Sequence, residues 1–196
     1  MQQLLTLARA EPDAASALKG EPVSLAELAA QAVADGAVLA EAKGIDLGVA
    51  DSANAAVVTG DPGALRTLLA NLVENAIRYA PKGGRVDVSS GVADGRPYVQ
   101  VADNGPGIPE SDRAHVFDRF YRGASKEPGS GLGLAIVKAI ADRHSATVSL
   151  GDTPGGGLTV RVEFPPAGAP RDPTIQARPG AGRAGTGVKT PLSQAP

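Results

Sequence analysis

The sequence predicts an α+β fold, a two-layer sandwich in which helices cover one face of a mixed β-sheet. Segments with a helical spacing of apolar residues and segments with a period of two follow in the order helix, strands, helix, hairpin, loop, helix, hairpin. Aromatic residues make up only 3% of the chain, so leucine, valine, isoleucine and alanine must form the core. The chain has no cysteine, which excludes disulfides and cysteine-type zinc sites as supports of the fold.

Length and charge limit the class of function. A chain of 196 residues fits one globular domain with room for tails. Its 19 basic and 21 acidic residues leave a formal net charge of −2, which gives no long-range attraction for nucleic acid. No apolar run approaches the roughly 20 residues that span a bilayer, so we expect a soluble chain. The two histidines, His115 and His144, lie too far apart in sequence to suggest a metal cluster or a catalytic triad.

The first predicted helix follows an N-terminal boundary. Residues 4–10 are expected to be the end of a helix, and a polar, flexible stretch is expected through residue 22. Ser24, with a glutamate three residues later, forms a capping box, and apolar residues then recur at helical spacing until Lys43 and Gly44 end the run. Two short strands are expected next, at residues 46–50 and 55–59.

The second predicted helix begins at Asp61 and Pro62, a cap followed by a first-turn proline. Its apolar stripe runs from Leu65 to Tyr79. The elements expected after it are strands around residues 86–88 and 99–101 joined by a turn at 93–96, a short amphipathic piece at 116–121, a helix at 134–143, and a strand pair at 147–150 and 158–164. From residue 166 the chain is rich in Pro, Gly and Ala, and we expect it to be disordered.

The second helix carries a polar stripe that borders its buried face. Asn71, Glu74, Asn75 and Arg78 are spaced by three and four residues and therefore project on one side. Amide oxygens are suitable ligands for magnesium, and arginine suits phosphate, so a magnesium-bound polyphosphate would explain the mixture. On this segment alone, an ordinary solvated helix face is the simpler alternative.

Two glycine-containing loops follow. In the first, Gly105 and Gly107 would let the backbone approach a flat ligand, and Asp103 could accept a hydrogen bond from an exocyclic amine such as that of adenine. An ordinary turn could have the same residues. The second loop, Gly129 to Gly133, opens a helix whose free amides would favour phosphate. It matches neither the dinucleotide-binding pattern nor the P-loop spacing.

Four segments, in this order, resemble the N, G1, F and G2 boxes of sensor histidine kinases: residues 71–79, 103–108, 116–122 and 129–137. The resemblance covers roughly residues 22–165. It implies ATP binding in the Bergerat fold, which is shared with gyrase, MutL and certain chaperones. It also implies a protein-histidine kinase domain of a two-component phosphorelay, which transfers the γ-phosphate of ATP to a histidine on a dimerisation domain for onward signalling to a response regulator.

The resemblance also assigns roles to residues. Asn75 would coordinate Mg²⁺, Asn71 would support the metal and the phosphates, and Arg78 would contact phosphate; these three form the implied catalytic set. Tyr79 would cover the adenine and Asp103 would bind its amino group. The remaining implied nucleotide-binding residues are Gly105 and Gly107, where the backbone approaches the base, and Gly129, Gly131, Leu132 and Gly133 in the lid. Phe117 and Phe120 would anchor that lid, although core packing explains them equally well.

The residue at position 71 distinguishes phosphate transfer from ATP hydrolysis within the superfamily. The ATPases that resemble gyrase carry a glutamate there, whereas this chain has Asn71. An amide is no general base, so bound ATP should be kept for transfer rather than hydrolysed. Two departures from the family pattern are a short lid between Arg122 and Gly129 and the sequence His144-Ser145-Ala146 in place of His-Gly-Gly, which should affect only a turn.

The acceptor histidine is absent from this sequence. Neither of its two histidines has the family's acceptor pattern, so self-phosphorylation of the chain alone is not expected. Residues 1–21 resemble the end of a dimerisation-domain helix and a linker, residues 22–165 the catalytic domain, and 166–196 a tail. A cytoplasmic location, in a parent protein that is a membrane sensor, is implied. The alternative is a nucleotide-binding remnant that acts as an interaction module without kinase activity.

Overall fold

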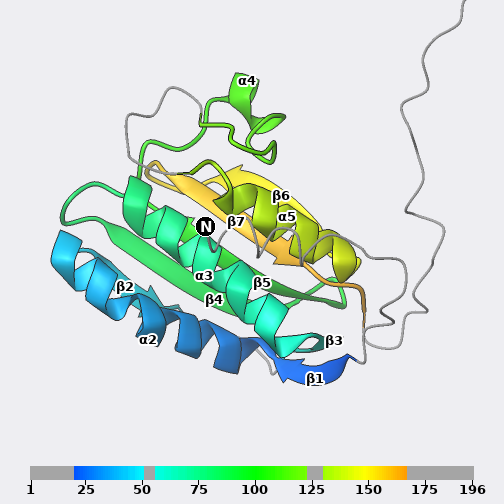
Figure 1. Cartoon of the computed structure of the whole chain (residues 1–196). Helices are drawn as coiled ribbons and strands as arrows, with labels where there is room; N and C mark the ends of the chain where they lie inside the picture. The colour runs from blue at the N-terminus through cyan, green and yellow to red at the C-terminus, as the bar shows by residue number, and fades with distance from the viewer. Residues whose placement is uncertain (1–19, 51–55, 123–129, 167–196) are drawn as a thin grey trace, which may run out of the picture.

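The computed structural model describes residues 20–50, 56–122 and 130–166. Its central layer is a five-stranded sheet built from β2 (Asp46–Val49), β4 (Arg85–Ala93), β5 (Arg96–Asp103), β6 (Thr147–Asp152) and β7 (Leu158–Glu163). The strands lie in the order β2-β4-β5-β7-β6 (Figure 1). The pair β2–β4 is parallel and the other neighbours are antiparallel, so the sheet is mixed as predicted.

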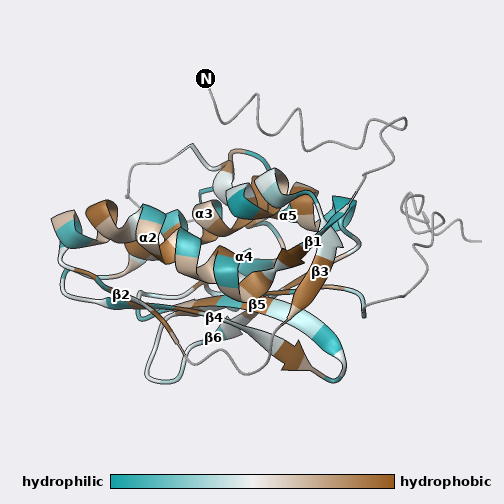
Figure 2. Ribbon diagram, turned by 90° about the horizontal axis from the view of Figure 1, so that it is seen from below, coloured by the Kyte–Doolittle hydropathy of each residue, from teal (hydrophilic) through white to brown (hydrophobic). Residues whose placement is uncertain are grey.

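The second layer consists of the helices α2 (Leu25–Lys43), α3 (Pro62–Tyr79) and α5 (Gly133–Arg143). All three lie on the same face of the sheet, as the view along the layers shows (Figure 2). Leucines of α3 and isoleucines of α5 pack on valines of the strands, and the core contains no buried aromatic ring except that of Phe164 among the described residues. The predicted α+β sandwich is therefore confirmed. Among the described residues, no helix is both long enough and apolar enough to cross a membrane.

The predicted helix ends are also confirmed. The hydroxyl of Ser24 accepts a hydrogen bond from the amide of Glu27 at 3.3 Å, and α2 ends at Gly44, whose φ of 69° is left-handed. The carboxylate of Asp61 accepts hydrogen bonds from the amides of Gly63 and Ala64 at the start of α3. The predicted turn at 93–96 joins β4 to β5, with positive φ at both of its central residues.

The structure differs from the expectations at two places. Residues Glu21–Ser24 form a strand, β1, which pairs with β3 (Val57–Gly60) in a separate two-stranded sheet. The expected flexible stretch through residue 22 is therefore wrong at its end. Apart from Pro22, Val23 is the one apolar residue of this strand, so the segment has no alternating pattern, and the distant partner strand supplies the order. The second difference is the short helix α4, at Glu110–Arg113, which was not predicted; the amphipathic piece expected at residues 116–121 forms turns. Pro109, followed by acidic residues, begins that helix. Expectations for residues 4–10 and for nearly all of the tail lie outside the described residues.

Helices α3 and α5 are joined by a hydrogen-bonded histidine at the end far from residues 103–108, the G1 loop. The ring of His144 lies with Nδ1 2.8 Å from the carbonyl oxygen of Ile140 and with Nε2 3.1 Å from the amide of Asp61. Because a carbonyl can only accept, Nδ1 carries the proton and Nε2 accepts from the cap of α3. Gly60 makes room for the ring, since a Cβ there would lie 2.7 Å from it. The contact fixes the end of α5 to the start of α3.

The turn after α5 contains a backbone conformation that serine adopts at a cost. Ser145 has φ of 55°, in the left-handed region. We expect Ser145→Gly to raise the free energy of unfolding by about 0.5–1 kcal/mol, because glycine removes the left-handed strain but has more entropy to lose on folding. Urea unfolding followed by circular dichroism measures the change. Ser149→Gly is the matched control in the extended strand β6 and should destabilise; a loss of stability in Ser145→Gly would contradict the expectation.

Candidate functional site

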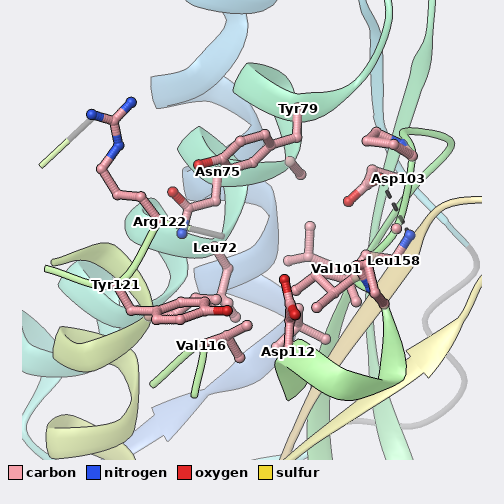
Figure 3. A pocket seen from close by; sticks show the side chains of 17 residues that line it. Leu72, Asn75, Tyr79, Val101, Asp103, Asp112, Val116, Tyr121, Arg122 and Leu158 are labelled. Atoms are coloured by element: carbon pink, nitrogen blue, oxygen red, sulfur yellow. Dashed lines mark hydrogen bonds between the residues drawn. The ribbon is translucent and has the colours of Figure 1, made fainter. Parts of the chain in front are cut away.

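A cavity of about 400 Å³ opens between α3, the strands β5 and β7, and the segment from Pro106 to Arg122. Its walls are mainly apolar, with a few polar groups at defined places (Figure 3). Such a shape is typical of a site for a small, partly aromatic ligand. The lining residues are Leu72, Asn75, Ala76, Tyr79, Val101, Asp103, Pro106, Gly107, Ile108, Pro109, Asp112, Val116, Tyr121, Arg122, Leu134, Leu158 and Val160.

Asp103, the last residue of β5, is the buried acid of the cavity. Its side chain is nearly inaccessible, and Oδ1 accepts hydrogen bonds from the amides of Gly105 at 2.8 Å and Leu158 at 3.3 Å. Burial raises the pKa of this carboxyl, and the two amide bonds oppose that rise. Since the folded pKa exceeds the unfolded one, ionised Asp103 costs folding stability at neutral pH, a cost that is absent below the unfolded pKa. The orientation leaves Oδ2 to accept from a ligand (Figure 3).

One wall of the cavity comes from α3. Leu72, Asn75, Ala76 and Tyr79 share a face of this helix because they are spaced by three and four residues. The amide of Asn75 lies against the first residue of α5, Gly133, where a Cβ would come within 2.8 Å of Nδ2. A larger residue at position 133 would therefore push the Asn75 amide out of place.

The opposite wall comes from α4 and the segment after it. Tyr121 extends across the cavity toward Asp112 (Figure 3). Desolvation, with the nearby carboxylate of Asp112, raises the pKa of the Tyr121 hydroxyl. Arg113 holds this wall in place, because its Nε donates to the carbonyl oxygen of Ile108 at 3.1 Å and its guanidinium pairs with Asp152.

The structure brings only some of the expected site residues to the cavity. Asn75, Tyr79, Asp103 and Gly107 line it. Asn71 lies one turn away on α3 and donates from Nδ2 to the carbonyl oxygen of Thr67 at 2.8 Å. The other expected residues outside the lining are Arg78, Gly105, Gly131, Leu132 and Gly133, and Gly129 falls outside the described residues.

Gly131, in the second glycine-containing loop, is required by the local packing of the backbone. Gly131 has φ of 69°, and its carbonyl oxygen accepts from the amide of Phe120 at 2.9 Å. A Cβ at Gly131 would lie 2.6 Å from the backbone of Phe120, so a side chain cannot fit between the two segments. Phe120 itself is 61% exposed, which excludes a core-packing role for it in this structure, while Phe117 is half-buried.

Several lining residues were not predicted as site residues. Tyr121 and Arg122 are the last two residues of the F box, and this motif was the signal that could have found them. Asp112 lies before that motif, in α4. Gly157 was also missed, although three consecutive glycines between two strands were a visible signal. Gly157 has φ of 116°, and a Cβ there would lie 1.9 Å from the carbonyl oxygen of Asp103. The β6–β7 turn thus packs directly on the G1 loop.

Comparison with known proteins identifies the family. The model of the family "Histidine kinase-, DNA gyrase B-, and HSP90-like ATPase" matches residues 60–168, more than half of the chain. The sensor protein QseC of Salmonella typhi is 40% identical over 166 residues, which cover 84% of this chain and 36% of QseC. The sensor protein CutS of Streptomyces coelicolor is 36% identical over 170 residues, 84% of this chain and 40% of CutS. The chain therefore spans about two fifths or less of these relatives' length.

Solved structures of sensor histidine kinases resemble this chain in fold. A mycobacterial sensor histidine kinase MprB has a TM-score of 0.65 at 32% identity, over 74% of this chain and 97% of that one. Full-length ShkA, solved in complex with AMPPNP, has a TM-score of 0.72 at 32% identity, over 84% of this chain and 34% of ShkA. The family match and these likenesses converge on one domain type. The chain belongs to the histidine kinase-, DNA gyrase B- and HSP90-like ATPases, and it matches the catalytic ATPase domain of two-component sensor histidine kinases.

Proposed function

We propose that the cavity binds ATP, with the adenine at Asp103 and the phosphates toward Asn75 and Arg122. The observation that carries the proposal is the buried carboxylate of Asp103 in a mainly apolar cavity of about 400 Å³. Apolar walls suit a purine ring, and a buried acceptor suits its exocyclic amino group. The AMPPNP complex of ShkA, a relative of the same fold, supports the choice of ligand.

Magnesium is proposed to accompany the nucleotide. The described residues contain no group of three histidine, cysteine or carboxylate side chains able to hold a metal by themselves. A single amide oxygen, that of Asn75, fits magnesium, because this ion commonly takes one or two protein ligands and completes its shell with substrate phosphates. The proposed ligand is the amide oxygen of Asn75, positioned by Gly133, with Asn71 in support one turn away. Bound there, the ion would neutralise charge on the phosphates.

Phosphate contacts are proposed at the start of α5 and on α3. The backbone amides of Gly131, Leu132 and Gly133 lie at the positive end of α5, which favours an anion, and the amide of Leu132 donates to the hydroxyl of Ser130 at 3.3 Å. Arg78 lies near the end of α3, close in sequence to the lining residues Asn75 and Tyr79, and would add a cation. At Gly105 and Gly107, which have no side chain, the backbone of the G1 loop would approach the base closely. Gly129 belongs to the same proposal by its place in the family motif.

The proposed reaction is transfer of the γ-phosphate to a histidine on a separate dimerisation domain, and from there to a response regulator. A nitrogen of that histidine forms the new bond to phosphorus while the bond to the bridging oxygen breaks, and ADP leaves. The chain's own part is to hold the nucleotide and to exclude water. Asn71 cannot accept a proton from water, so the bound nucleotide should hydrolyse slowly.

The proposed division of the chain remains 1–21 for the end of a dimerisation helix and its linker, 22–165 for the catalytic domain and 166–196 for a tail. The solved cytoplasmic segment of QseC, 29% identical with a TM-score of 0.58, supports a cytoplasmic position for the domain.

The proposal predicts magnesium-dependent binding that requires Asn75. We expect calorimetric titration to show saturable binding of AMPPNP, tightened by magnesium. In Asn75→Ala we expect most of that tightening to be lost, about tenfold or more, because the metal loses its protein ligand. Titrations with magnesium and with EDTA separate the metal's contribution from that of the base.

Gln31→Ala is the matched control, since this amide is exposed on α2 and bonds to Asp35. Equal magnesium dependence in Asn75→Ala and the unaltered chain would contradict the proposed metal ligand. Absence of AMPPNP binding by the folded chain would contradict the proposed ATP site. Phosphorylation of a separately supplied acceptor domain distinguishes the kinase from the alternative, a nucleotide-binding remnant that acts as an interaction module without kinase activity.

A further inference from the structure

The last turn of α3 is capped by a lysine from another helix. Lys43, at the end of α2, donates from Nζ to the carbonyl oxygens of Ile77, at 3.0 Å, and of Arg78. Carbonyls in a final turn lack partners within their own helix. The shortage is unavoidable at Ile77, because the residue four positions later is Pro81, which has no amide hydrogen. The ammonium group also lies at the negative end of the α3 dipole.

This turn carries part of the cavity wall. The ring of Tyr79 lines the cavity, and Asn75 lies one turn before it. The carbonyl oxygen of Tyr79 contacts the G1 loop, since a Cβ on Gly105 would lie 2.8 Å from it. The final turn of α3 is therefore held between Lys43 on one side and Gly105 on the other.

The end of α2 is also fixed by backbone contacts outside α3. Gly44 stops the helix in a left-handed conformation, and the amide of Ile45 bonds back to the carbonyl oxygen of Ala40 at 2.8 Å. The amide of Asp46 then bonds to the carbonyl oxygen of Gly84 at 2.9 Å, next to the start of β4. The backbone that carries Lys43 is thus anchored to the sheet. A lysine on an anchored support can set the position of the turn it contacts.

We propose that Lys43 is a positioning residue of the nucleotide site, which fixes the last turn of α3 so that Tyr79 meets the adenine. The inference rests on the proposed ATP site. Lys43 does not line the cavity, so its effect on binding must pass through the turn that it caps. Loss of the two hydrogen bonds should let the last turn of α3 move. The affinity for the base should then fall, while the rest of the chain stays folded.

A double-mutant cycle with Tyr79 tests this role. We expect Lys43→Met to weaken AMPPNP binding about fivefold to tenfold in the unaltered background and less than about twofold in Tyr79→Ala, because coupled residues are non-additive. Lys43→Arg retains a cationic donor and should restore binding to within about threefold. All titrations are made on the full chain at a temperature where circular dichroism shows each variant to be folded.

Lys138→Met is the matched control, because Lys138 pairs with Asp142 on the surface of α5 and should leave binding unchanged. Equal losses in both backgrounds, or unchanged binding by folded Lys43→Met, would overturn the positioning role alone. Absence of binding by the unaltered chain would overturn the ATP site and this role with it. Should Lys43→Met not fold, the ammonium signal of Lys43 is followed by ¹⁵N NMR in the unaltered chain; it should shift on addition of AMPPNP, and a static signal overturns the proposal.

Discussion

Gly157→Ala is expected to lower the free energy of unfolding by about 3–4 kcal/mol, a large share of the total for a domain of this size. A Cβ at this position would lie 1.9 Å from the carbonyl oxygen of Asp103, and φ of 116° is unfavourable for alanine. The obstructing atom belongs to the backbone and cannot rotate away, so the β6–β7 turn must separate from the G1 loop. Urea unfolding followed by circular dichroism gives the loss directly.

The neighbouring glycine separates the two causes of that loss. Gly156 has φ of 106°, but no atom lies within 4 Å of the Cβ that alanine would add. Gly156→Ala should therefore cost only the backbone strain, about 1–2 kcal/mol. The difference between the two variants measures the clash with the G1 loop. Equal losses in both would show that the turn does not depend on its contact with Asp103.

Asp103→Asn is expected to weaken AMPPNP binding about 100-fold, roughly 2.7 kcal/mol. Asparagine has the same shape and can keep Oδ1 on the amides of Gly105 and Leu158. Its amide group then replaces Oδ2, so that one donor faces the amino group of adenine, another donor. Calorimetric titration measures the change, and Asp87→Asn, in an exposed pair with Arg85, serves as the control.

Asp103→Asn should leave the stability unchanged or raise it, while it lowers the preference for ATP. Burial raises the pKa of Asp103, so ionisation costs folding stability at neutral pH, and the neutral asparagine should unfold at the same or a higher urea concentration. Inosine triphosphate carries an oxygen where ATP carries the amino group, and that oxygen can accept from the new amide. The preference for ATP over inosine triphosphate should therefore fall at least about tenfold. An unchanged preference would remove Asp103 from the base site.

Local signals were sufficient to predict the three long helices and a polar face of α3. The caps at Ser24 and Asp61 lie within a few residues of the amides they serve, and residue spacing grouped Asn75 with Asn71, Glu74 and Arg78. Of these four side chains, that of Asn75 lines the cavity, while Tyr79 was assigned to the site by the family motif. A helix rises about 1.5 Å per residue, so a residue four positions before Asn75 lies about 6 Å along the axis, and Asn71 falls outside the cavity lining.

Contacts between distant segments account for what the sequence did not reveal. Strand β1 is ordered by β3, and its own residues show no alternation that predicts the pairing. Gly157 is required by the backbone of Asp103, a residue in another strand. Lys43 caps a helix that begins 19 residues after it, at Pro62. None of these partners can be inferred from the composition of the segment itself.

The position of β7 in the sheet also bears on how the chain is made. This strand is the last along the chain, yet it lies between β5 and β6 and supplies both Leu158 and the turn that supports Asp103. During synthesis, the helices and the β4–β5 hairpin leave the ribosome first, while one side of the base site is still missing. We therefore expect a nascent or prematurely terminated chain that lacks β7 to bind no nucleotide. Acquisition of ATP would then mark the completion of this domain.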